Sequence, residues 1–174
     1  MWLKLNLDGI IISLRIQQYR KTNQSNCDDV WCKVDFSFCS EPWLNYHKEY
    51  EEVLLAREID SLTEDLEKLL NDQLSEPTEF SCIEPDFVFN LNPKEDVRNN
   101  PRLVYVRPGY EIVDIDMEWR VNFWDDGCLT ANYLSVSLCR EEIEYLLIYL
   151  KIVSRQLSEH DDIVQELISK GILY

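Results

Sequence analysis

The fold of this chain is decided by residues 111–157, which read EIVDIDMEWRVNFWDDGCLTANYLSVSLCREEIEYLLIYLKIVSRQL. Apolar and polar side chains alternate without a break from 112 to 123, a pattern typical of a strand with one buried and one solvated face. Because parallel strands are covered on both faces, this pattern predicts an antiparallel sheet. Asp126-Gly127 supplies the turn chemistry of a hairpin, and helical spacing of apolar residues begins after Arg140.

The two faces of the 112–123 strand differ in chemistry. The face expected to be buried carries apolar side chains, namely Val113, Ile115, Met117, Trp119, Val121 and Phe123. The face expected to meet solvent carries polar ones, namely Asp114, Asp116, Glu118, Arg120 and Asn122. A weaker alternation at 134–138 predicts the second strand of the hairpin.

The remaining segments carry shorter versions of these patterns. A first hairpin is predicted around Asp8-Gly9, and a turn is predicted at Glu84-Pro85-Asp86. The other expected elements are hairpin strands within 3–16, strands at 31–38, 50–55, 80–83, 87–91 and 102–107, and helices at 57–70 and 159–170. Loops are expected at 21–29 and 92–101, and residues 42–49 fit no clear pattern.

The chain reads as two similar halves, about 1–74 and 77–157, followed by the C-terminal helix 159–170. The sequence LAREID at 55–60 resembles LCREEIE at 138–144 with one insertion. We therefore predict a single α+β domain over 1–174. Its mostly antiparallel sheet would have about seven or eight strands from two strand-meander-plus-helix halves, with two or three helices packed on the sheet. Chance similarity of two amphipathic segments is the alternative to a duplication.

The charge of the chain constrains its partners. A net charge of −16 and a pI near 4.4 disfavour direct binding to the phosphate backbone of nucleic acids. Such a surface would steer a basic partner, although net charge also serves solubility alone. No segment approaches the ~20 apolar residues of a membrane helix, and the first residues lack the apolar run of a signal peptide. We expect a cytoplasmic protein without membrane contact.

No cofactor or metal is predicted. The six cysteines form no C-x-x-C pair, so we expect reduced cysteines that pack as small apolar side chains. The alternative is a zinc site that combines Cys27, Cys32 and Cys39 with His47, although their spacing does not meet the usual rule. Neither histidine has a spacing that indicates a catalytic base or a metal ligand.

Three acidic groups are candidates for binding a partner. The first is the row Asp114, Asp116 and Glu118. This row has three alternative interpretations, namely a solvated sheet face, an acidic docking strip for a partner, or part of a metal-dependent hydrolase site. The second is the corner Trp124, Asp125 and Asp126, which reads as an interface anchor or as a turn with a core-packed tryptophan. The third is the helix face Glu58, Asp60, Glu64 and Asp65.

Several segments resemble the WapI-type immunity proteins, which protect bacteria from contact-dependent polymorphic toxins. The resemblance is carried by Asp28-Asp29-Val30-Trp31, by the helix around 55–70, by FSCIEPDFVF at 80–89 and by the final strand-helix pair, about residues 28–157 in all. It implies a small cytosolic α+β protein that binds and blocks a cognate toxin, commonly a nuclease. No binding residue carries over, because immunity faces diverge with each toxin.

We therefore predict a non-enzymatic acidic protein that neutralises a basic toxin domain by direct binding. One alternative is a metal-dependent hydrolase that uses the carboxylates of the 111–124 strand, and another is a structural or regulatory domain. The sequence does not indicate an oligomeric state.

Overall fold

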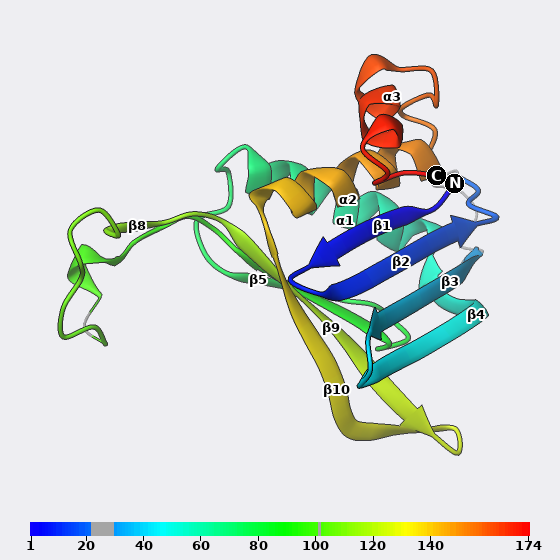
Figure 1. Ribbon diagram of the computed structural model, residues 1–174, viewed down its shortest axis with the longest axis horizontal. Helices are drawn as coiled ribbons and strands as arrows, with labels where there is room; N and C mark the ends of the chain where they lie inside the picture. Colours follow the sequence, from blue (N-terminus) through cyan, green and yellow to red (C-terminus); the bar gives the residue numbers. More distant parts are fainter. Residues whose placement is uncertain (22–29, 101) are drawn as a thin grey trace.

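The computed structural model describes residues 1–21, 30–100 and 102–174, and in this part of the chain ten strands form three antiparallel sheets (Figure 1). The first sheet has the order β1-β2-β3-β4, with β1 Leu3–Leu7, β2 Ile10–Gln17, β3 Trp31–Ser40 and β4 Leu44–Leu55. The second has the order β10-β9-β6-β5, with β5 Thr78–Ser81, β6 Phe87–Asn92, β9 Asp116–Asp125 and β10 Cys128–Cys139. The α+β class is confirmed, with the strands divided among separate sheets.

The two tight hairpins follow the turn chemistry of the sequence. Asp8 and Gly9 both adopt positive φ, 48° and 96°, between β1 and β2, and Asp126 and Gly127 do so between β9 and β10, at 46° and 74°. Two successive residues with φ above zero match the right-handed twist of the flanking strands. The predicted loop at 21–29 lies almost wholly outside the described residues.

The long strand β4 spans most of residues 42–49, which fit no clear pattern in the sequence, together with the short strand expected at 50–55. β4 pairs with β3 along its length, from Ser40 opposite Leu44 to Trp31 opposite Leu55. Its exposed outer half mixes polar and aromatic side chains, so the sequence lacks the clean alternation of a half-buried strand.

A projecting arm, residues 93–115, separates β6 from β9 (Figure 1). It contains β7 Glu95–Asp96, the 3₁₀ turn η1 Val97–Asn99 and β8 Ile112–Val113. Residues 102–107, all described, form no strand, so that prediction is wrong, and the expected polar loop at 92–101 includes the base of the arm. The alternating strand 112–123 is broken between β8 and β9. Val113 consequently lies exposed on the arm rather than in the core.

Aromatic rings join the two four-stranded sheets. Trp119 on β9 is fully buried, with its ring centroid 5.6 Å from that of Phe38 and 5.3 Å from that of Phe87. Phe36 on β3 lies edge-on to Phe87 at 4.8 Å. Edge-to-face contacts of this kind are favourable arrangements of aromatic pairs. The core therefore lies between the inner faces of the sheets, and Ile115, Met117 and Val121 of the predicted apolar face are buried there.

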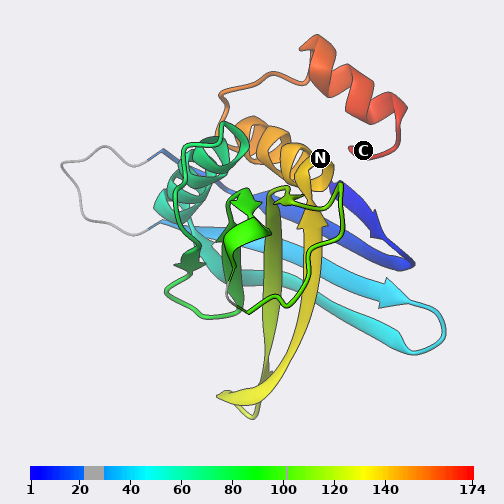
Figure 2. The same ribbon diagram turned by 90° about the vertical axis from the view of Figure 1, so that its left-hand side faces the viewer.

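In the described residues the last strand of each four-stranded sheet, β4 or β10, runs directly into a helix, α1 Ala56–Leu70 or α2 Arg140–Val153. These two helices lie side by side (Figures 1 and 2). Glu58 in α1 and Glu142 in α2 both accept a hydrogen bond from the backbone N–H at the helix start, from Leu55 at 2.8 Å and from Cys139 at 2.7 Å. This contact aligns LAREI at 55–59 with CREEI at 139–143 without an insertion. A duplication of the halves stays a prediction.

The C-terminal segment covers the outer edge of the first sheet. Helix α3 Asp162–Ser169 is shorter than predicted and is followed by Gly171 at positive φ. Residues 172–174 then pair with β1, because Trp2 N–H donates to Tyr174 O at 2.7 Å and Lys4 N–H donates to Ile172 O at 2.8 Å. Both chain ends meet there (Figure 1). Among the described residues no helix is long and apolar enough to cross a membrane.

Candidate functional site

The candidate site is a pocket of about 600 Å³ where β4, the β5–β6 turn and the β9–β10 turn meet. We call it the acidic pocket and define it by its lining residues, Trp31, Lys48, Glu51, Glu52, Val53, Glu84, Asp86, Trp124, Asp126 and Gly127. It lies at the opposite end of β9 from the arm, because the arm enters β9 at Asp116 and the turn follows Asp125.

A buried carboxylate shapes the β4 side of the pocket. Asp35 on β3 is buried and accepts hydrogen bonds from Arg15 Nε at 2.6 Å, from Gln17 Nε2 at 2.8 Å and from the backbone N–H of Tyr50 at 2.8 Å. Tyr50 has a φ of 60°, and the pairing of β3 with β4 is irregular around this position. Bulges of this kind re-aim the side chains that follow. Here they are Glu51 and Glu52, neighbours that both line the pocket.

The β5–β6 turn is held against β9 by Asn122. Its backbone N–H donates to Asp86 O at 2.9 Å, and its side-chain amide donates to Pro85 O. These bonds fix the carbonyls of the acidic turn, so that Glu84 and Asp86 face the pocket. Asn122 had been expected on a solvated face and is instead a structural contact between two elements of the site.

The pocket carries unbalanced negative charge. Among the described residues its lining has five carboxylates and one lysine. Lys48 Nζ lies 3.8 Å from Glu51, and Glu52 is paired at 2.6 Å with Lys33 outside the pocket. Within the same described part of the chain, Glu84, Asp86 and Asp126 belong to no ion pair. A cation that enters the pocket would therefore meet three carboxylates not already neutralised.

The environment of the pocket raises the pKa of the Asp86 carboxyl group above its ordinary value. Burial is the main cause that raises this pKa. The indole N–H of Trp124 lowers this pKa in part, the charges of Glu84 and Glu51 raise it further, and the charge of Lys48 lowers it. Trp124 is half-buried, and the contact of its Nε1 with Asp86 falls short of good hydrogen-bond geometry. The pocket thus places a partly desolvated carboxyl group beside an indole ring, a combination that favours a cationic ligand.

A family match extends over the elements that build this pocket. The sequence matches the immunity protein WapI-like family over residues 3–157. The chain belongs to this family. The match is longer than the resemblance at 28–157, includes the arm and ends before α3. Searches of curated proteins and of solved structures each found no match. Membership indicates an immunity protein, whose partner is a protein toxin.

One of the three sequence-predicted groups contributes to the pocket of this immunity protein. Trp124 and Asp126 line it, and Asp125 is exposed beside them. Sequence reasoning missed Trp31, Glu51, Glu52, Glu84 and Asp86, although the EPD turn and the EYEE run at 49–52 were visible as acidic segments. Nothing in the sequence indicated that these segments converge.

The carboxylates of the row Asp114, Asp116 and Glu118 accept hydrogen bonds from neighbouring side chains. Asn92 Nδ2 donates to Asp116 at 2.8 Å, and Glu118 accepts from Asn90 Nδ2 at 2.9 Å and from the Ser135 hydroxyl. The bonds from Ser135 and Asn90 lower the pKa of Glu118. Asp116 and Glu118 therefore act as cross-strand contacts on β9.

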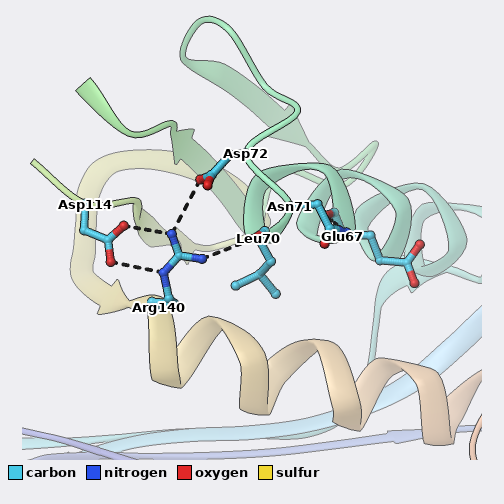
Figure 3. Close-up of polar contacts among 6 residues, drawn as sticks. All are labelled: Glu67, Leu70, Asn71, Asp72, Asp114 and Arg140. Atoms are coloured by element: carbon cyan, nitrogen blue, oxygen red, sulfur yellow. Dashed lines mark hydrogen bonds and ion pairs between the residues drawn. The ribbon is translucent and has the colours of Figure 1, made fainter. Parts of the chain in front are cut away.

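Asp114 lies outside the strand and is held by Arg140 at the start of α2 (Figure 3). Arg140 Nη2 lies 2.8 Å and Nε 3.0 Å from the two oxygens of Asp114, while Nη1 donates to Leu70 O at 3.1 Å. Asp72 lies 3.5 Å from the same guanidinium. The hydrogen bonds from Arg140 are the largest cause that lowers the pKa of Asp114 to about 2. Arg140 thus fastens the base of the arm to the ends of both main helices.

The acidic helix face is smaller than predicted, because Glu58 is buried. Its two carboxylate oxygens accept from Leu55 N–H at 2.8 Å and from Ile83 N–H at 2.7 Å, which joins α1 to the β5–β6 turn. Asp60 accepts from the Tyr19 hydroxyl at 2.7 Å. Glu64 is exposed, and Asp65 is half-buried and paired with Lys68 at 2.8 Å. The prediction of Glu58 as a surface contact is wrong.

Possible metal ligands are dispersed in the part of the chain that the structure describes, where no three His, Cys, Asp or Glu side chains gather into a metal-binding group. Of the alternative zinc set, Cys27 lies outside the described residues. Cys32 is buried in the core, where burial raises the pKa of its thiol to about 12, and His47 is exposed on β4.

Proposed function

We propose that this immunity protein neutralises its cognate toxin by binding a basic surface of the toxin at the acidic pocket. The observation that carries the proposal is the unbalanced charge of the pocket, in which Glu84, Asp86 and Asp126 face the cavity without a paired cation among the described residues. Charge complementarity of this kind accelerates association and orients the partners.

The tryptophans give the pocket a preference for particular cations. Trp31 and Trp124 contribute indole surface to the same cavity as the carboxylates. A guanidinium or ammonium group gains cation–π attraction over such a ring, and an arginine can also bind a carboxylate through two parallel hydrogen bonds. An arginine or lysine side chain of the toxin is therefore the ligand that we expect in the pocket.

Neutralisation would follow from occlusion rather than from chemistry. A toxin that acts on nucleic acid needs a basic surface to hold phosphates, and an acidic protein that covers this surface excludes the substrate. We propose a basic toxin domain, with nuclease activity as the form that this logic suits best. The proposed place of action is the cytoplasm, where such a toxin meets its target.

Co-purification tests the proposal directly. The protein is expressed with the toxin domain encoded beside its gene, the complex is isolated, and toxin activity is measured with and without the protein. The proposal requires a stoichiometric complex in which activity is lost and is restored by dissociation in high salt. A toxin that stays active in a stable complex would refute occlusion, and the absence of a complex would refute the assignment of this partner.

A further inference from the structure

The arm is an exposed apolar element of an otherwise acidic protein. Its tip, residues 102–110, reads RLVYVRPGY, with two arginines and no acidic residue in a chain of net charge −16. Val104 is fully exposed, Tyr105 is 75% exposed and Tyr110 is 63% exposed. Monomeric proteins rarely hold a continuous set of large apolar side chains in solvent, so a surface of this kind indicates a docking site.

The base of the arm is held in place. The β7–β8 ladder pairs Glu95 with Val113 and Asp96 with Ile112. Val97 N–H donates to Glu111 O at 2.9 Å, and Arg140 holds Asp114 where the arm rejoins the body (Figure 3). Arg107 lies over the ring of Tyr110 at 5.3 Å. The arm therefore presents arginine and tyrosine, both common in interface hot spots, on an anchored ribbon.

The composition of the tip defines the surface that would receive it. Arginine and tyrosine flanked by leucine and valine fit a site that combines carboxylates with aromatic rings. The acidic pocket of this chain is such a site, with Glu51, Glu84 and Asp86 beside Trp31 and Trp124. The toxin proposed above fits the tip poorly, since its contact surface would also be basic.

The arm of a molecule cannot fill the pocket of that same molecule. The arm joins β9 at Asp116 and the pocket lies beside the turn after Asp125, so ten strand residues, about 33 Å, separate them. The arm also points away from the body (Figure 1). A second copy can bring its tip to the pocket without this restriction.

We propose that the free protein self-associates head to tail, with the arm tip of one copy in the acidic pocket of the next. Such a contact is heterologous, so it builds rings or short open chains rather than a two-fold dimer. The toxin would compete for the same pocket and release the assembly into one-to-one complexes. The inference goes beyond toxin binding, because the pocket can bind a toxin whether or not it also binds the arm.

Sedimentation velocity of the full chain over a range of protein and salt concentrations tests this inference. We expect the mass to rise with protein concentration and to fall with salt. Arg102→Glu/Arg107→Glu should weaken association at least tenfold, while Lys4→Glu/Arg20→Glu, which makes the same charge change at exposed positions of the body, should leave it unchanged. A monomer at every concentration up to the solubility limit would overturn the proposal.

Mixing a charge-reversal variant of the pocket with the charge-reversal variant of the arm identifies the two contacting surfaces. Glu51→Lys/Glu84→Lys in the pocket should also abolish self-association, and an equimolar mixture of this variant with Arg102→Glu/Arg107→Glu should form heterodimers. If the arm variant associates normally but loses toxin binding, the arm belongs to the toxin interface and self-association by this route is refuted. If both variants associate normally, neither surface takes part.

Discussion

Removal of the Glu58 carboxylate should destabilise the protein, because two backbone N–H groups lose their acceptor. Glu58 accepts two backbone hydrogen bonds, from Leu55 at 2.8 Å and from Ile83 at 2.7 Å, in a buried position. A hydrogen bond to a charged group contributes about 1.5–3 kcal/mol, and relief from burying the charge offsets part of the sum. Glu58→Ala should therefore lower the free energy of unfolding by about 3–4 kcal/mol, which corresponds to roughly 10 °C in Tm.

Glu142→Ala is the matched control, because Glu142 has the same place at the start of α2. It is half-buried and accepts one backbone hydrogen bond, from Cys139 at 2.7 Å, so its loss should cost about 1 kcal/mol. Glu58→Gln keeps one acceptor oxygen and should fall between these values. Urea unfolding followed by tryptophan fluorescence measures all three variants. Equal losses of unfolding free energy for the two alanine variants would refute this structural role.

Three further predictions concern the Arg140 contacts at the base of the arm and the acidic pocket. Arg140→Met should lower the free energy of unfolding by about 1–2 kcal/mol at pH 7, since most of its contacts are solvent-exposed. The part that comes from Asp114, whose pKa lies at about 2, should be present above pH ~4 and disappear as pH falls through about 2, as urea unfolding at several pH values will test. Toxin affinity should rise with pH through the raised pKa of Asp86, and Asp86→Asn should remove this dependence in titration calorimetry. Trp124→Ala should weaken toxin binding at least tenfold in surface plasmon resonance while circular dichroism stays unchanged.

Local patterns predicted most of the secondary structure. The hairpins at Asp8-Gly9 and Asp126-Gly127, the helices α1 and α2 and the one-sided strand β9 follow from turn chemistry and periodicity, which depend on near neighbours in sequence. The continuous β4 was missed because its outer half is an exposed edge. The arm was missed because an exposed apolar run, such as that at 102–107, has the composition of a strand.

The candidate site was less predictable, because it depends on contacts between distant segments. Trp124 and Asp126 were found from a single turn, whereas Glu51 and Glu84 reach the same pocket from elements far apart in the chain. Glu58 has the spacing of a surface acid on a helix, but it is buried and accepts a hydrogen bond from Ile83 N–H of the β5–β6 turn. The periodicity of a segment indicates which of its faces is polar, but it does not indicate which neighbouring loop packs on that face.

The affinity of the toxin complex for two charge-matched variants tests the central claim most directly. Glu51→Lys/Glu84→Lys reverses two carboxylates of the acidic pocket, and Glu64→Lys/Asp65→Lys reverses two on the face of α1. If the pocket is the binding site, the first variant should raise Kd about 100-fold or more and the second only about threefold, through net charge alone. Equal losses, or a larger loss for the helix variant, would contradict the assignment of the pocket.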